Sequence, residues 1–182
     1  MKNIMYEFLD LVKIVLIALI VVLPIRYFLF QPFIVNGQSM EPTYCDRDYL
    51  LVDQISYRFK EPQRGEVIVF YYPEDVRFRH IKRIVGLPGE TISITNDKIE
   101  VIDADGNILE IDESEYLPFN TTKLGEVELV LPEDSFFVMG DNRGASFDSR
   151  KWGYLPKEYI IGKVFLRAYP FQRFELIEAP AY

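Results

Sequence analysis

The first segment that could do chemistry is a short stretch around a serine, Gly37–Thr43, which reads GQSMEPT. Glycine lets a backbone approach a ligand closely, and Pro42 stiffens the turn that follows. A serine held in such a turn can present its hydroxyl together with its backbone N–H. Most serines in segments that contain Gly and Pro are turn formers only, so Ser39 by itself is weak evidence for a nucleophile.

The second segment, Arg79–Glu90, reads RHIKRIVGLPGE and begins inside a predicted strand over Val76–Val85. Alternate residues of a strand share a face, so Lys82 shares its face with the apolar Ile84. Burial there disfavours the ammonium and lowers its pKa, which a lysine needs to act as a general base near neutral pH. The alternative is that Lys82 extends from an edge strand into solvent. Solvent or carboxylates can reach the opposite face, which carries Arg77, Arg79 and Arg83.

His80 is the only histidine among the 182 residues. A metal site with several histidine ligands is therefore excluded, and we expect neither a metal nor a cofactor. A Ser–His–Asp triad would have to use His80 itself. Because it lies two residues from Lys82 on the same predicted face, His80 is the rival candidate for the base.

The third segment, Gly140–Arg150, reads GDNRGASFDSR and is followed by Trp152-Gly153. It is dense in hydrogen-bonding groups, and Asp148 and Arg150 are spaced to pair across a tight turn. A turn network or an exposed charged loop has the same composition. Acidic loops can also bind Ca²⁺, but the spacing does not fit an EF-hand and the arginines would repel a cation.

The elements that must position these residues begin with an apolar stretch. Residues 11–30 read LVKIVLIALIVVLPIRYFLF, in which only Lys13 and Arg26 are charged. A helix needs about 20 apolar residues to cross a membrane, so we predict one transmembrane helix over 11–30 and a membrane anchor over 1–31. A cleaved secretory signal is one alternative, but no A-x-A-like site follows the stretch. A buried core helix is the other, and it would seldom be apolar on all sides in so small a domain.

After the anchor the chain consists of short runs of β-branched and aromatic residues, separated by Pro, Gly, Asp and Asn. The fold class is therefore predicted as mainly β, an antiparallel β-sheet catalytic domain over residues 32–182. Residues 95–130 are acidic and lack chemical motifs, which predicts an inserted smaller β subdomain. The expected strands are Tyr49–Ile55, Glu66–Tyr72, Val76–Val85, Thr91–Ile94, Lys98–Ile102, Asn107–Ile111, Glu126–Leu131, Phe136–Met139 and Lys163–Tyr169.

Composition narrows the classes of partner. The chain has 28 acidic and 20 basic residues and a formal net charge of -8. This balance argues against nucleic acid as a partner, because such a surface needs clustered Lys and Arg. Cys45 is the only cysteine, so no internal disulfide can form.

Taken together and in this order, the three segments resemble type I signal peptidases. The resemblance covers nearly the whole chain: an anchor, G-x-S-M-x-P-T, I-K-R-x-V-G-L-P-G-[DE], and G-D-N-R-x-x-S-x-D-S-R with a nearby W-G. It implies that Ser39 is the nucleophile and that Lys82 is the general base. It further implies that Ser146 orients Lys82, that Asp148 and Arg150 brace their loop, and that Met40 lines the site.

The resemblance also implies what the enzyme acts on. We expect a membrane-bound serine endopeptidase that cleaves signal peptides from preproteins after small residues at an A-x-A type site. The expected partners are these preproteins and the lipid bilayer, and the secretion translocon is a candidate. The expected location is the cytoplasmic membrane, crossed once, with the catalytic domain on the outer face. The backbone N–H of Ser39 is the expected oxyanion donor, and Gly37 lacks the side-chain hydroxyl that some relatives add.

Three alternative functions differ from this expectation. A self-cleaving repressor shares a Ser–Lys dyad, but it would need a DNA-binding domain where this chain has an apolar span. The second reading makes His80 the base, as in the signal peptidases of the eukaryotic secretory membrane. A catalytically inactive, membrane-tethered β-domain that acts as a binding module is the alternative outside enzymes, and the presence of Ser39, Lys82 and Ser146 disfavours it.

Overall fold

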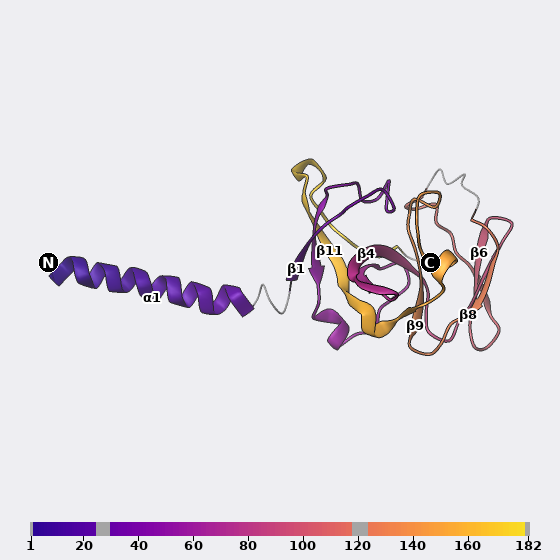
Figure 1. Cartoon of the computed structure of the whole chain (residues 1–182), viewed down its shortest axis with the longest axis horizontal. Helices are drawn as coiled ribbons and strands as arrows, with labels where there is room; N and C mark the ends of the chain where they lie inside the picture. The colour runs from indigo at the N-terminus through magenta and orange to yellow at the C-terminus, as the bar shows by residue number, and fades with distance from the viewer. Residues whose placement is uncertain (1, 25–29, 118–123, 181–182) are drawn as a thin grey trace.

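The computed structural model describes residues 2–24, 30–117 and 124–180. These residues form an N-terminal helix, α1, that lies apart from two antiparallel sheets (Figure 1). The helices are α1 (Lys2–Pro24) and α2 (Ser149–Trp152), with short 3-10 turns η2 (Ser56–Arg58), η3 (Lys157–Tyr159) and η4 (Phe171–Arg173). The strands are β1 (Phe30–Ile34), β2 (Tyr49–Asp53), β3 (Val67–Tyr72), β4 (Asp75–Gly86), β5 (Thr91–Thr95), β6 (Lys98–Ile102), β7 (Ile108–Glu110), β8 (Val127–Val130), β9 (Ser135–Met139), β10 (Leu155–Pro156), β11 (Ile160–Tyr169) and β12 (Glu175–Leu176).

The larger sheet runs in the order β1-β2-β11-β3-β4-β9-β10, with β12 paired to β11. Neighbouring strands pair antiparallel throughout. The prediction of a mainly β fold with antiparallel sheets is confirmed. Strands β3 and β9 lie inside this sheet, and their apolar runs are buried on both faces. Such continuous burial explains why these strands lack the alternation of a half-solvated strand.

The smaller sheet, in the order β7-β6-β5-β8, is built from residues between Thr91 and Val130. One hydrophobic cluster joins the two sheets, with Ile92 and Ile94 from the smaller one and Phe137 and Met139 from the larger one. Gly86 lies at this contact, where a Cβ would come within 2.4 Å of the Ile92 side chain. Close packing of the sheets thus requires glycine there. The assignment of residues 95–130 to a separate subdomain stays a prediction.

Helix α1 begins and ends earlier than the predicted span of residues 11–30. The described part of the helix ends at Pro24. Residues 25–29 lie outside the described residues, and Phe30 is the first residue of β1, where it pairs with Asp53. Within the described ranges, no helix has the combination of length and apolar character that membrane crossing requires.

Candidate active site

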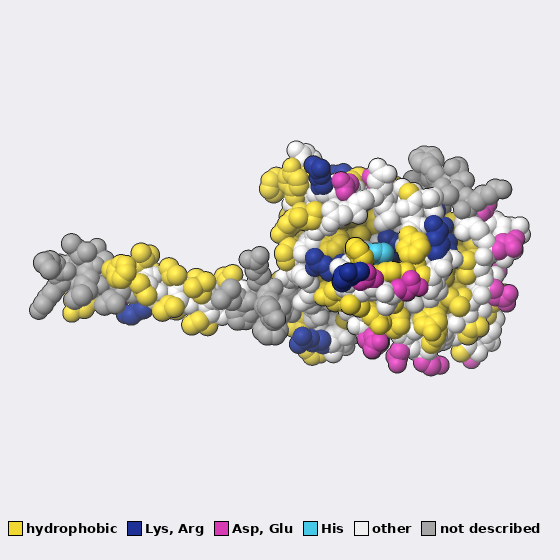
Figure 2. Space-filling model, in the orientation of Figure 1, with side chains coloured by type: hydrophobic (Ala, Val, Ile, Leu, Met, Phe, Trp, Pro, Cys, Tyr) yellow, Lys and Arg dark blue, Asp and Glu magenta, His cyan; other side chains and the backbone are white. Residues whose placement is uncertain are grey.

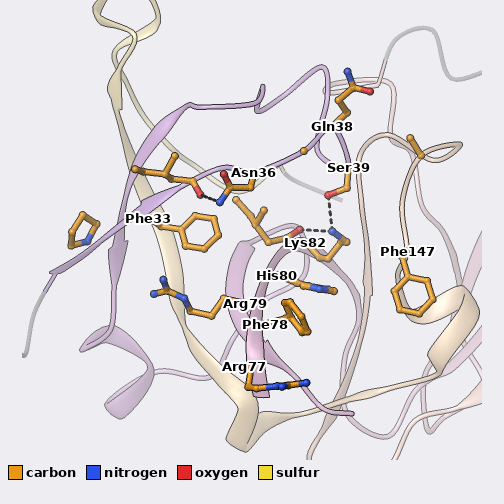
Figure 3. Close-up of a pocket in the computed structure, with 15 residues that line it drawn as sticks. Phe33, Asn36, Gln38, Ser39, Arg77, Phe78, Arg79, His80, Lys82 and Phe147 are labelled. Carbon is orange, nitrogen blue, oxygen red and sulfur yellow. Dashed lines mark hydrogen bonds between the residues drawn. The ribbon is translucent and has the colours of Figure 1, made fainter. Parts of the chain in front are cut away.

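Ser39 and Lys82 lie side by side although 43 positions separate them in the sequence. Ser39 lies in the connection between β1 and β2, and Lys82 lies in the second half of β4. The Lys82 Nζ donates hydrogen bonds to Ser39 Oγ at 2.7 Å and to the Ile81 carbonyl at 2.8 Å (Figure 3). Lys82 is 3% exposed, so the alternative of a lysine that extends into solvent is wrong. A hydroxyl in contact with a buried amine is the arrangement that a Ser–Lys dyad needs.

Buried side chains and backbone hydrogen bonds hold the turn that carries Ser39. Met40 and Tyr44 are fully buried, and the Tyr44 N–H donates to the Met40 carbonyl at 2.8 Å. Gly37 has φ 92°, a backbone conformation that favours glycine, and its N–H donates to Asp46 Oδ1 at 2.8 Å. Met40 therefore lies beneath the turn, in the core, and anchors the backbone that presents Ser39.

Burial controls the protonation of Lys82. It lowers the pKa of Lys82 from its ordinary value of 10.5 to about 8, although the carboxylates of Asp148 and Asp141 oppose the shift. Both carboxylates come from the Gly140–Arg150 loop, which we call the 140–150 loop, and not from the strand that carries Lys82. A substantial fraction of Lys82 is thus neutral slightly above neutral pH.

His80 has a different environment. Its ring stacks on Tyr72, with centroids 5.2 Å apart and the planes 7° from parallel. Partial burial, and then the charge of Lys82, lower the pKa of His80 to about 4. His80 is therefore neutral at physiological pH, and it lines the pocket together with Lys82 (Figure 3).

The 140–150 loop is organised around Asp148. Its carboxylate caps the short helix α2, accepts a hydrogen bond from the Gly140 N–H at 3.0 Å, and pairs with Arg150 at 2.8 and 2.9 Å. Burial by itself would raise the pKa of Asp148, but the contacts with Arg150 hold it below its ordinary value. Asp148 is thus a buried anion that is hydrogen-bonded to both ends of the loop, at Gly140 and at Arg150.

Ser146 lies in the same loop and is 3% exposed. No hydrogen bond links it to Lys82 in the part of the chain that the structure describes. Its hydroxyl lies against Gly140, where a Cβ would come within 2.3 Å of Ser146 Oγ and 2.4 Å of the Ser39 carbonyl oxygen. Asn142 donates its N–H to that carbonyl at 3.1 Å. The Ser146 hydroxyl and the Ser39 carbonyl therefore both lie close to Gly140.

Two buried ion pairs beside the site were not identified in the sequence. Arg83 donates to both carboxylate oxygens of Asp141, at 2.9 and 2.7 Å, and to the Gly65 carbonyl. The sequence offered a partial signal, because Arg83 lies on the strand face assigned to solvent or carboxylates. Arg143 pairs with Glu113, and no motif marked Glu113.

The site opens into a hollow of about 710 Å³ between the β1–β2 connection and β4. Phe33, Phe78 and Phe147 supply apolar surface to it, and His80 and Lys82 also line it (Figure 3). In the part of the chain that the structure describes, strand β4 pairs with β9 only from Arg83 to Gly86, which leaves its first half paired with β3 on one edge alone. Among the described residues, no group of three or more His, Cys, Asp or Glu is placed to bind a metal ion.

The comparisons with known proteins agree in pointing to one family. The model of the family described as signal peptidase, peptidase S26, matches residues 8–169. A probable signal peptidase I-2 from Synechocystis is 34% identical over 174 residues, covering 93% of this chain and 77% of that protein. A signal peptidase I from Leptolyngbya laminosa is 36% identical over 179 residues, covering 94% and 85%. A signal peptidase I P from Bacillus subtilis subsp. natto is 37% identical over 174 residues, covering 90% of each.

Among solved structures, a signal peptidase I from Enterococcus faecalis is 31% identical and has a TM-score of 0.47, covering 57% of this chain and 97% of that one. The family model and the curated relatives each extend over most of the sequence, and they include the three segments that carry the chemistry. The chain therefore belongs to the peptidase S26 family, the signal peptidases.

Proposed function

We propose that this peptidase cleaves signal peptides from preproteins with Ser39 as its nucleophile and Lys82 as its general base. The observation that supports these roles is the 2.7 Å contact between Lys82 Nζ and Ser39 Oγ, made by a buried lysine whose pKa is lowered to about 8. A serine hydroxyl is a poor nucleophile until a base removes its proton, and a lysine can remove it only when neutral.

The reaction follows from this pair. Neutral Lys82 takes the proton of Ser39 Oγ as the oxygen attacks the scissile carbonyl carbon. The carbonyl π electrons move to its oxygen, which accepts a hydrogen bond from the Ser39 N–H. The tetrahedral intermediate collapses, the C–N bond breaks, and the Lys82 ammonium gives its proton to the leaving amine. A water molecule then hydrolyses the acyl-enzyme with Lys82 again as base.

A second oxyanion donor is not supplied by Gly37. It has no side chain, and its N–H is already used in the bond to Asp46 Oδ1. The proposed roles of the remaining residues are supportive. Met40 anchors the Ser39 turn from the core, Asp148 and Arg150 brace the 140–150 loop, and Ser146 lies within that loop beside Gly140.

The substrate is proposed to bind as an extended strand. The first half of β4 has one free edge facing the hollow, and an extended peptide can add to such an edge through main-chain hydrogen bonds. Small residues at the cleavage site, of the A-x-A type, would let the substrate backbone approach Ser39 closely. This specificity rests on the family resemblance and on the position of Ser39 in a half-buried turn.

The proposed location is the cytoplasmic membrane, with the β-rich residues 32–182 on the outer face and residues 1–31 as the anchor. Leu11, Ile14, Ile17 and Ile20 are each between 59% and 70% exposed, and hydrophobic side chains run along the described part of α1 (Figure 2). A helix that is apolar around its circumference is unfavourable in water, which supports a lipid environment. The translocon remains a proposed partner only.

The test is cleavage of a preprotein with an A-x-A site in liposomes by the wild-type chain and by Ser39→Ala, Lys82→Ala and His80→Ala. We expect the first two variants to lose cleavage and the third to retain it, with folding of each checked by circular dichroism. Loss in Ser39→Ala and His80→Ala alone would move the base to histidine. A wild-type chain that is folded but does not cut would instead support the inactive binding module.

A further inference from the structure

The segment Asp112–Leu117, which follows β7 of the smaller sheet, reaches back to the 140–150 loop. Glu113 Oε1 accepts a hydrogen bond from Arg143 NH2 and a second one, at 2.6 Å, from the Tyr116 hydroxyl. Glu113 and Arg143 are 30 positions apart, so the pair joins the smaller sheet to the loop that lies against Ser39. No motif of the family resemblance includes Glu113.

The pair is largely removed from water. The Arg143 side chain is 0% exposed and the Glu113 side chain is 12% exposed. Burial alone would lower the pKa of Arg143, but Glu113 more than offsets it and the pKa is raised. Removal of one member of a buried pair leaves the other charge uncompensated, which is far more costly than the loss of a surface ion pair.

Arg143 is also bound to the backbone of its own loop. Its Nε donates to the Gly140 carbonyl at 3.0 Å, and its own carbonyl accepts from Arg150 NH2 at 2.8 Å. Between these two points, Asn142 donates its N–H to the Ser39 carbonyl at 3.1 Å. The Arg143 guanidinium therefore fixes the backbone between Gly140 and Arg143, which is hydrogen-bonded to Ser39 through the Asn142 N–H.

Tyr116 makes the second contact of the same segment with the site. Its ring lies 3.9 Å from the guanidinium carbon of Arg83, the residue next to Lys82. A cation over an aromatic face at this distance is attracted by the ring. The Tyr116 hydroxyl and Arg143 share one oxygen of Glu113, so this carboxylate links the surroundings of both proposed catalytic residues.

We propose that Glu113 is a positioning residue: it holds Arg143, and through Arg143 the Gly140–Arg143 backbone that presents Ser39 to Lys82. The proposal rests on the proposed function of the Ser39–Lys82 pair. It gives the smaller sheet a role in the reaction without contact with the substrate. Displacement of a nucleophile by as little as 1 Å can cost about a hundredfold in rate, so a modest relaxation of this backbone should be measurable.

The experiment compares Glu113→Gln with Glu115→Gln in the full-length chain reconstituted in liposomes. Glu115 is exposed in the same segment and serves as the matched control. We expect Glu113→Gln to lower kcat for preprotein cleavage by about tenfold to a hundredfold with KM changed less than about twofold, since substrate contacts are untouched. Glu115→Gln should match the wild type, and Glu113→Asp, which keeps the charge, should recover part of the lost kcat.

A double-mutant cycle separates positioning from simple destabilisation. Rates are expressed per folded enzyme, measured by near-ultraviolet circular dichroism well below each unfolding temperature. In an Arg143→Gln background, Glu113→Gln should lower kcat no further, because the residue through which it acts is gone. Unchanged kcat per folded enzyme in Glu113→Gln, or additive losses in the cycle, would overturn the proposal. If the wild type itself does not cleave preprotein, the proposed function is wrong, and the positioning role of Glu113 is wrong as well.

Discussion

At the residue scale, the site depends on a lysine kept close to neutrality by burial. The sequence predicts desolvation of Lys82 from the residues of its own strand. The folded chain adds Asp148 and Asp141, whose carboxylates act against the lowered pKa. The Lys82 pKa of about 8 results from burial, which lowers it, and from the two carboxylates, which raise it. Burial has the larger effect.

The pH dependence of cleavage follows from this balance. Lys82 must be neutral to accept a proton, so kcat/KM should rise with pH through a midpoint near 8 and fall away below it. His80, with a pKa of about 4, would place the midpoint far lower if it were the base. Initial rates of preprotein cleavage between pH 5 and 10 distinguish them. A rate that is constant between pH 5 and 10 would contradict the assignment of Lys82.

The same lowered pKa should cost stability. The unfolded chain binds the Lys82 proton up to about pH 10.5 and the folded chain only up to about 8, so stability rises with pH between these values. We expect Lys82→Met to raise the free energy of unfolding at pH 7 by at most about 3 kcal/mol, with the gain shrinking toward pH 10.5. Urea unfolding at both pH values measures it. Lys60→Met, at an exposed lysine, is the control and should show no such trend.

Gly140 offers a test of close packing at the site. A Cβ there would lie 2.3 Å from Ser146 Oγ and 2.4 Å from the Ser39 carbonyl, so Gly140→Ala must displace one or both. We expect a loss of kcat of about a hundredfold. Gly106→Ala, at φ 85° with open space around it, should cost about 1 kcal/mol of stability and leave kcat unchanged. Equal kcat values in the two variants would show that Gly140 does not hold the site.

At the element scale, β4 agrees with the sequence prediction in its bounds but differs from it in its burial. The predicted strand Val76–Val85 corresponds to β4 at Asp75–Gly86, and the prediction for β6 matches at both ends. Alternation predicted one buried face, but both faces are covered from Ile81 onward, so Lys82 and Arg83 are equally buried. The charge of the buried Arg83 is neutralised by Asp141, which follows the end of β9.

The smaller sheet should stabilise the fold through its shared cluster with the larger one. Ile94 is fully buried in that cluster, so Ile94→Ala should lower the free energy of unfolding by about 2–5 kcal/mol through lost contacts and a cavity. Ile108→Ala, at a position 64% exposed in the same sheet, should change it by less than about 0.5 kcal/mol. Denaturant unfolding monitored by fluorescence gives both values. Similar losses for the two would mean that the sheets do not share a core.

At the scale of the whole molecule, α1 and the sheets present different surfaces. Apolar side chains are exposed along the described part of α1, whereas charged side chains are spread over the β-rich part (Figure 2). We expect the triple change of Ile14, Ile17 and Ile20 to Asn to abolish flotation with phospholipid vesicles. Phe59→Ser removes an apolar side chain that is 81% exposed on the β-rich part, and it should leave flotation intact. Flotation of the triple variant at the wild-type level would contradict attachment through α1.

Two aromatic residues that follow α1, Phe30 and Phe33, pack within the β-rich part of the protein. Phe33 is 8% exposed in the core, and the Phe30 ring packs on Phe165 with centroids 4.8 Å apart. The predicted span of residues 11–30 includes Phe30, because hydropathy does not distinguish a strand that pairs with β2 from the end of a helix.

The sequence by itself determined the strand-rich character of the chain, the positions of most strands and the three segments that carry the chemistry. These features depend on neighbouring residues, through side-chain periodicity and turn formers, so they can be read locally. Only the tertiary structure decided that Ser39 meets Lys82, that Arg83 meets Asp141 and that Glu113 meets Arg143. Between 30 and 58 positions separate the members of these pairs. A pKa or an ion pair depends on burial and on charges through space, and the packing of the two sheets sets both.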